Sequence, residues 1–273
     1  MCLRGFALNF FTVNLIIWQT IYVLGGIFLL PLSPFLYLQG QYVRRKIGRL
    51  PDAGGETKGK SYNGKGSAKL LVLGESTAAG MGARTHEAAL AGQFAQVLGA
   101  KIGQSVEWHV VGRSGITVKE TIRDLVPQIP NEKFDYIMLA LCGNEVLKLR
   151  SPRVFRRDMR KLVAILQEKN ADATFFITNA PAVRLSPVLP NPIKFILGHL
   201  SALHDANARE FTAEMKNVFY FNQPSSVPAD FFADGLHPSE KGYTAWSKSM
   251  IEFFEEKYDW QVEVESKLKE TRK

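Results

Sequence analysis

The sequence predicts an α/β domain built on a parallel sheet that helices cover on both faces. Two observations lead to this fold class. From about residue 68 onward, short apolar runs alternate with longer amphipathic stretches, and the short runs are apolar throughout. Strands that are buried on both faces have this composition, and they occur in parallel sheets that lie between two layers of helices.

A long apolar segment precedes this domain. No charged side chain occurs in residues 5–43, and residues 6–30 are dense in Phe, Leu, Ile, Val and Trp. A helix rises about 1.5 Å per residue and crosses the hydrocarbon core of a bilayer in roughly 20 residues. Residues 1–43 are therefore predicted to form a hydrophobic anchor helix that meets the membrane through residues 6–38.

Three other arrangements of this segment compete with a spanning anchor. The segment could turn back near Gly25 or Pro31 as a re-entrant hairpin, lie in the interface as a helix, or be cleaved as a signal peptide. Cleavage is the least favoured, because no small-residue site such as Ala-x-Ala follows the apolar run.

The basic residues that flank the apolar segment are unequally placed. Arg4 alone precedes it, whereas four basic residues follow it closely: Arg44, Arg45, Lys46 and Arg49. Positive flanks tend to stay cytoplasmic, so the domain is expected to face the cytoplasm from the inner (cytoplasmic) membrane; a periplasmic or extracellular domain is the alternative. Residues 44–67 are predicted to be a basic juxtamembrane segment that continues, from residue 51, as a flexible linker rich in Gly and Lys.

Composition limits what the rest of the chain can be. Of the net charge of +8, residues 1–66 carry +6, from eight Lys or Arg and two Asp or Glu. The folded domain, predicted over residues 68–260 and followed by a charged tail at 261–273, has no basic concentration of the kind that binds nucleic acid. The two cysteines, Cys2 and Cys142, give neither a disulfide framework nor a zinc site.

Five strands and five helices are expected within the domain. The apolar runs predict strands at residues 70–73, 106–111, 136–141, 174–178 and 218–221. The amphipathic stretches predict helices at residues 87–98, 118–125, 153–167, 193–215 and 239–256. The proline-rich stretch 181–197 is a candidate wall or lid of a pocket, with ordinary loop packing as the alternative.

Unusual residues follow four of these strands, where open parallel sheets bind their ligands. The four groups are Gly74-Glu75-Ser76, Gly112-Arg113-Ser114-Gly115, Cys142-Gly143-Asn144-Glu145 and Asp234-Gly235-Leu236-His237-Pro238. Serine is a poor nucleophile unless a histidine takes its proton and a carboxylate orients that histidine. Ser76, His237 and Asp234 are the candidates, because a carboxylate three residues before a histidine on a compact turn can reach its far nitrogen.

The negative charge that develops on a carbonyl oxygen needs fixed donors. The backbone N–H groups of Ser76 and Gly115 and the side-chain amide of Asn144 are the candidates for this oxyanion hole. Glycine at position 115 lets the backbone approach a substrate closely, because it has no side chain.

These four blocks, in this order, resemble the SGNH hydrolases, also called GDSL-type lipases and esterases. The resemblance covers residues 68–260. It implies a flavodoxin-like three-layer α/β/α sandwich with no metal or cofactor. It also implies Ser76 as nucleophile, with His237 and Asp234, and Ser76, Gly115 and Asn144 as oxyanion donors.

The sequence departs from the family pattern at two positions. Glu75 stands where the family usually has Asp, and Glu145 stands in place of the Asp of the Gly-x-Asn-Asp block. Without the other blocks, Ser76 would be interpreted as a helix N-cap. Neither the G-x-S-x-G elbow nor a P-loop fits the sequence that follows Gly74.

The predicted function is a membrane-tethered serine esterase or lipase that acts on a small acyl-ester or lipid-like substrate. An O-deacetylase of envelope carbohydrate is the alternative enzyme. A catalytically silent module that binds an acyl or glycan ligand is the alternative from another class.

Overall fold

The computed structural model describes residues 3–48 and 50–255, and in the first helix it describes the side chains from Leu15 onward. Its centre is a six-stranded sheet in the order β1-β3-β2-β4-β5-β6. The strands are β1 (Lys58–Ser61), β2 (Ser67–Gly74), β3 (Ser105–Gly112), β4 (Tyr136–Ala140), β5 (Thr174–Ile177) and β6 (Val218–Tyr220). The last five pair in parallel, so the predicted parallel sheet is confirmed for the five predicted strands.

The helices are α1 (Leu3–Leu29), α2 (Ser33–Ile47), α3 (Leu90–Ile102), α4 (Val118–Asp124), α5 (Gly143–Leu147), α6 (Pro152–Lys169), α7 (Ile193–Thr212) and α8 (Glu240–Glu255). Short 3-10 turns form η1 (Leu30–Leu32), η2 (Val126–Gln128) and η3 (Val183–Leu185). The predicted helix at 87–98 begins three residues late, because Thr85 turns the chain through bonds from the backbone N–H groups of Ala88 and Ala89. The predicted tail and the end of the last helix, residues 256–273, lie outside the described residues.

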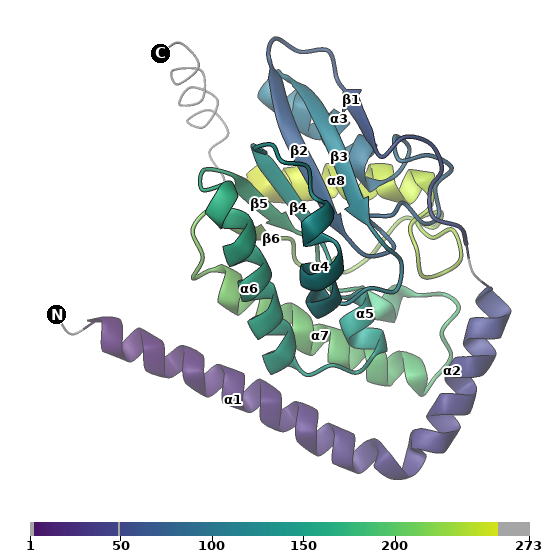
Figure 1. Cartoon of the computed structure of the whole chain (residues 1–273). Helices are drawn as coiled ribbons and strands as arrows, with labels where there is room; N and C mark the ends of the chain where they lie inside the picture. Colours follow the sequence, from purple (N-terminus) through teal and green to yellow (C-terminus); the bar gives the residue numbers. More distant parts are fainter. Residues whose placement is uncertain (1–2, 49, 256–273) are drawn as a thin grey trace.

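Two apolar cores lie on opposite faces of the sheet. Along β2, Leu70 and Val72 belong to one core, whereas Leu71 and Leu73 belong to the other. Helices α3 and α8 cover the first face, and α4, α6 and α7 cover the second (Figure 1). This alternation explains why the strands are apolar throughout, and it makes the predicted three-layer α/β/α sandwich the observed architecture.

The expectation of a flexible linker over residues 51–67 is wrong for much of that stretch. Residues Lys58–Ser61 form β1, which pairs antiparallel with β3 at the edge of the sheet. The indole N–H of Trp108 donates to Ser61 Oγ at 3.1 Å, and a Cβ at position 59 would lie 2.3 Å from the Trp108 ring. The backbone pairing with β3 therefore stabilises a strand that the composition of this stretch does not predict. Gly59 lets the strand lie against the Trp108 ring because it has no side chain.

Helices α1 and α2 form a bent apolar arm that lies beside α6 and α7 (Figure 1). The bend is at η1, where Pro31 and Pro34 interrupt the helical hydrogen bonds. Within the described residues, one helical stretch, Leu15–Ile47, is long and apolar enough to cross a membrane by length and composition.

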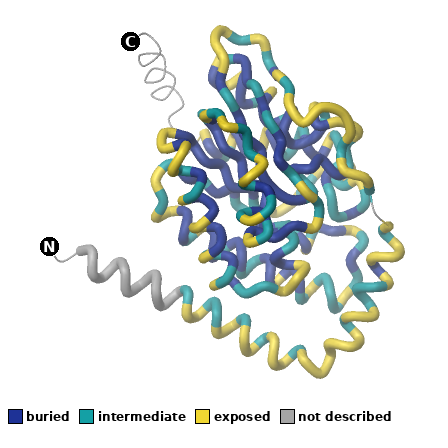
Figure 2. Tube along the Cα trace, in the orientation of Figure 1, coloured by how far each residue is buried: buried dark blue, intermediate teal, exposed yellow. Residues whose placement is uncertain are grey.

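One side of this arm touches the domain and the other is open. Tyr22 donates through its hydroxyl to the carbonyl of Leu149 at 2.5 Å, and Val43 joins the core under α7. Figure 2 shows the outer side as largely exposed. The exposed large apolar side chains there are Ile16, Ile17, Ile21, Val23, Leu24, Ile27, Phe28, Leu30, Leu32, Phe35, Tyr37, Leu38 and Tyr42.

Candidate active site

The loops after β2, β3 and β4 meet at one edge of the sheet. Gly74 is in register with both Gly112 and Ala140, so the residues that follow these strands lie side by side. A Cβ at position 74 would lie 2.1 Å from the carbonyl oxygen of Ala140. Glycine is therefore required immediately before Glu75 and Ser76, and the strand spacing places Ser76 at the centre of this edge.

Ser76, His237 and Asp234 form one hydrogen-bonded line. His237 Nε2 lies 3.1 Å from Ser76 Oγ, and His237 Nδ1 lies 2.8 Å from Asp234 Oδ2. The Asp234–His237 turn is fixed by its own backbone, because Asp234 Oδ1 accepts the N–H groups of Leu236 and His237 at 2.8 and 2.7 Å. The structure thus brings together the three residues that the sequence marked as nucleophile, base and orienting carboxylate.

The environment of Asp234 favours its ionised form. Burial raises the pKa of this carboxyl, but hydrogen bonds from the side chain and backbone of His237 outweigh burial and hold the pKa below its usual value. An ionised Asp234 accepts the Nδ1–H of His237 and so leaves Nε2 free to accept a proton from Ser76.

The backbone N–H groups of Ser76 and Gly115, both at this edge, have no acceptor within the described chain. Gly115 has a φ of +82°, and a Cβ there would meet no atom within 4 Å. Glycine is needed at this position for its left-handed backbone rather than for lack of space, and the loop is open to a ligand.

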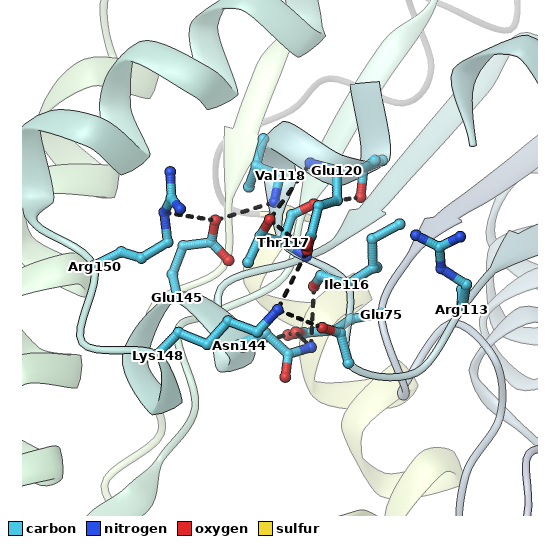
Figure 3. A network of polar contacts seen from close by, with 12 residues as sticks. Glu75, Arg113, Ile116, Thr117, Val118, Glu120, Asn144, Glu145, Lys148 and Arg150 are labelled. Atoms are coloured by element: carbon cyan, nitrogen blue, oxygen red, sulfur yellow. Dashed lines mark hydrogen bonds and ion pairs between the residues drawn. The ribbon is translucent and has the colours of Figure 1, made fainter. Parts of the chain in front are cut away.

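Asn144 lies beside Glu75, and its amide is already occupied. Its Nδ2 donates to Glu75 Oε2 and, at 3.0 Å, to the carbonyl of Ile116 (Figure 3). The backbone N–H groups of Gly143 and Asn144 also donate to Glu75, at 2.6 and 2.8 Å. Glu75 therefore fixes the loop after β4, and Asn144 can reach an oxyanion only by releasing one of its two acceptors.

A family model described as "GDSL-like Lipase/Acylhydrolase family" matches residues 72–245, which is more than half of the chain. The chain belongs to this family. It is accordingly a hydrolase that acts on ester bonds, and the resemblance to SGNH hydrolases inferred from the four blocks is confirmed.

Solved structures similar to this acylhydrolase show the same fold. The lipase Lip_vut3 from a goat rumen metagenome is 16% identical, with 67% of this chain and 95% of that one covered and a TM-score of 0.54. TesA is 17% identical, with coverages of 68% and 97% and a TM-score of 0.51. An extracellular lipase from Streptomyces rimosus is 10% identical, with coverages of 68% and 98% and a TM-score of 0.50. A search of curated proteins finds no match.

The two departures of this acylhydrolase from the family pattern are both buried carboxyls. Burial raises the pKa of Glu75 to about 7, against the lowering effect of the N–H groups of Asn144 and Gly143. Burial likewise raises the pKa of Glu145 to about 7, against the lowering effect of the Val118 N–H and of Arg150. Each carboxyl also caps a helix: Glu75 binds the first turn of α5, and Glu145 accepts the Val118 N–H of α4 at 3.0 Å (Figure 3).

Glu145 is the less well satisfied of the two. Its side chain is 0% exposed, its Oε2 has no hydrogen-bond partner within the described chain, and Arg150 Nε lies 4.0 Å from Oε1. A buried carboxylate without full hydrogen bonding is costly to ionise. The folded protein therefore retains the Glu145 proton at pH values where the unfolded chain, with a pKa of about 4.3, has lost it.

Replacing Glu145 with glutamine is expected to stabilise the protein at pH 8 and to have little effect at pH 5. Between about pH 4.3 and 7 the folded state binds more protons than the unfolded state, so the parent loses stability as pH rises, and the neutral variant escapes this loss. The difference is measured as the change in Tm between parent and variant at both pH values. Each kcal/mol of added stability raises Tm by about 2–4 °C. An equal shift at pH 5 and pH 8 would contradict the assignment.

Glu120→Gln provides a control of opposite sign. Hydrogen bonds from Thr117 lower the pKa of Glu120 to about 2, so its ionised form stabilises the fold. This contribution is present above the pKa of the unfolded chain and is lost as pH falls through the folded pKa. The Glu120 variant should therefore be less stable than the parent at pH 8.

The sequence did not indicate two features around the site. Asp52, from the stretch expected to be a linker, accepts a hydrogen bond from Ser114 Oγ and so holds the loop next to Gly115. Val188, from the proline-rich stretch 181–197, packs against Gly235. A Cβ at position 235 would lie only 2.4 Å from Val188 Cγ1. That stretch is thus a wall of the Asp234 turn.

Cys142, two residues before Asn144, is buried, and burial raises the pKa of its thiol well above the usual value. Among the described residues, no three His, Cys, Asp or Glu side chains are grouped as metal ligands.

Proposed function

We propose that this acylhydrolase cleaves a carboxylic ester through an acyl-enzyme on Ser76. The hydrogen-bonded line from Ser76 Oγ through His237 to Asp234, with distances of 3.1 and 2.8 Å, carries the proposal. As Oγ attacks the ester carbonyl carbon, its proton passes to His237 Nε2, and Asp234 stabilises the resulting imidazolium. The intermediate then expels the alcohol, which takes that proton. Water repeats both steps on the acyl-enzyme, releasing the acid and restoring Ser76.

The oxyanion is assigned to the N–H groups of Ser76 and Gly115, with Asn144 as the third donor. Both backbone groups lack an acceptor within the described chain. A charged oxyanion is a stronger acceptor than the neutral carbonyl of Ile116, so the Asn144 amide exchanges one for the other as charge develops. Each such donor is worth about 2.7–4 kcal/mol of transition-state stabilisation.

Residues 1–43 are assigned as a membrane attachment, and residues 68–260 as the hydrolase domain. The bend at η1 and the contact of Tyr22 with Leu149 favour a bent arm on the membrane face of the domain over a straight span that projects away from it. Four basic residues follow the apolar run, at the end of α2 and just beyond it, and they support a domain on the cytoplasmic side. A cysteine introduced at Lys65 and a membrane-impermeant maleimide test this orientation. In intact cells we expect the cysteine to be protected from the reagent. Labelling of the cysteine would place the domain on the outer side of the membrane instead.

The substrate class is an acyl ester of a lipid. An apolar arm beside α6 and α7 of the domain brings the enzyme to a surface where such esters are concentrated. The similar solved structures include two described as lipases, which supports the same class.

Labelling of the full-length protein with a fluorophosphonate probe, followed by hydrolysis of p-nitrophenyl esters of increasing acyl length, tests the function. We expect labelling, and rates that rise from acetate towards longer acyl chains. A rate confined to acetyl esters would favour an O-deacetylase of carbohydrate. Failure of the folded protein to react with the probe would favour a silent binding module.

A further inference from the structure

A cavity of about 240 Å³ lies outside the candidate active site, between η3 and the first turns of α7. It is lined by Arg184, Asn191, Lys194, Phe195 and His199. No carboxylate is among these residues, whereas an arginine and a lysine are. The lining therefore suits an anion.

The cationic groups are not neutralised by neighbouring acids. Arg184 has no hydrogen bond or ion pair with any residue in the described part of the chain. The aliphatic part of its side chain packs on α7 at Gly198, where a Cβ would lie 2.9 Å from Arg184 Cγ. Lys194 Nζ donates to a neutral acceptor, the carbonyl of Ser186, at 2.6 Å. Most other arginines of the domain have an acidic partner, as Arg156 does with Glu210 at 2.8 Å.

The histidine contributes an aromatic ring to the lining of the cavity. His199 Nδ1 lies 2.8 Å from the carbonyl of Phe195, which fixes that nitrogen as the donor and leaves Nε2 without a partner in the described chain. The Phe195 and His199 rings lie 4.1 Å apart between centroids, and Phe195 is 63% exposed. The cavity thus combines positive charge with an exposed apolar rim.

The apolar arm meets the domain at this cavity. Gln39 of α2 donates to the carbonyl of Asn191 at 2.8 Å and accepts the N–H of Ile193 at 3.1 Å. Across the same contact, a Cβ at Gly40 would be in ordinary contact with Ile193, at 3.6 Å. Phe35 and Leu38 of α2 are exposed, and Phe35 lies one helical turn before Gln39, on the same face of the helix. A ligand seated here would have its charged group in the cavity and its apolar part along the arm.

We propose that this cavity binds the phosphate group of an anionic membrane lipid, with Arg184 and Lys194 as its charged contacts and the acyl chains along α2 and Phe195. This binding site is separate from the chemistry proposed for Ser76. A free phosphate ion would use the charges but leave the apolar rim without a role, so the lipid accounts for both halves of the surface.

The site has a direct connection to the candidate active site. Ser186, whose carbonyl accepts from Lys194, donates through Oγ to the carbonyl of Gly235 at 2.7 Å, within the turn between Asp234 and His237. A lipid phosphate that draws Lys194 away therefore acts on the segment that packs against the histidine turn.

The binding can be measured without hydrolysis. Full-length protein in neutral detergent is titrated with a fluorescent, short-chain, ether-linked phosphatidylglycerol, and fluorescence anisotropy is recorded. Arg184→Gln/Lys194→Gln is expected to bind this lipid at least about tenfold more weakly than the parent. The control Lys65→Gln/Lys248→Gln, which removes the same charge from exposed sites elsewhere on the domain, should bind within about twofold of the parent.

Two further arms separate the alternatives. Arg184→Lys/Lys194→Arg keeps both charges and should keep binding, which distinguishes loss of charge from loss of fold. Inorganic phosphate should displace the lipid only at concentrations far above those of the lipid itself. Equal binding by both glutamine variants would overturn the proposal, and displacement by phosphate at lipid-like concentrations would reassign the cavity to free phosphate. Because the ether lipid cannot be cleaved, none of these outcomes depends on Ser76.

Discussion

Replacing Ser76 with alanine is expected to lower kcat/KM for a p-nitrophenyl ester by about 10⁴- to 10⁶-fold. The change removes the Oγ that lies 3.1 Å from His237 Nε2, and with it the acyl-enzyme route. The backbone N–H of residue 76 remains, so the residual rate reports what the oxyanion donors and substrate binding supply without a nucleophile. Initial rates at saturating and sub-saturating ester give the loss in kcat and in kcat/KM separately.

Thr77→Ala is the matched control for this variant. Thr77 is the neighbouring hydroxyl, is half-buried like Ser76, and has no side-chain hydrogen bond within the described chain. It should keep activity within about tenfold of the parent. Both variants should unfold at the temperature of the parent, and fluorophosphonate labelling should vanish only in Ser76→Ala. A Ser76 variant with parent activity would eliminate the proposed nucleophile.

Replacing Asp234 with asparagine is expected to lower kcat by about 10⁴-fold while leaving the turn in place. Asparagine Oδ1 can still accept the N–H groups of Leu236 and His237 that now bind Asp234 Oδ1. Its NH₂ group would then face His237 Nδ1, which must accept rather than donate. The ring proton moves to Nε2, and His237 can no longer take the proton of Ser76.

Asp230→Asn separates this effect from a general loss of negative charge. Asp230 lies four residues earlier, is exposed, and pairs with Lys241 at 2.9 Å rather than with His237. Its loss should leave kcat within about twofold of the parent. Rates, thermal unfolding and fluorophosphonate labelling should be compared across pH 6 to 9. Similar losses in both variants would show that Asp234 acts through its charge alone and does not set the histidine tautomer.

The sheet and the meeting of the four blocks could be predicted from the sequence because both follow from local patterns. Five apolar runs gave five strands, and the carboxyl ends of parallel strands lie at one edge wherever the sheet has this topology. Ser76 follows β2 and Asn144 follows β4, so their proximity required no knowledge of side-chain packing. Asp234 and His237 meet because they share one short turn.

Features that depend on contacts between distant residues could not be predicted. Strand β1 has the sequence KGKS, without the β-branched or aromatic residues that mark strands, and it exists because its backbone pairs with β3. The block after β4 identified Asn144 but not the direction of its amide. That direction depends on Glu75, whose extra methylene relative to Asp carries the carboxylate to the amide.

The hydrogen-bonded residues just before β1 limit how far the domain can stand from the arm. The chain is bonded to the domain from Asp52 onward, through Ser114 and then through the backbone of Ala53 and Gly54. Helix α2 ends at Ile47, so the chain takes only five residue steps from there to Asp52, which reach at most about 18 Å when fully extended. With the arm in the bilayer, as proposed, this short connection would hold Ser76 at one level above the membrane surface, and the proposed ester substrate would have to reach that level.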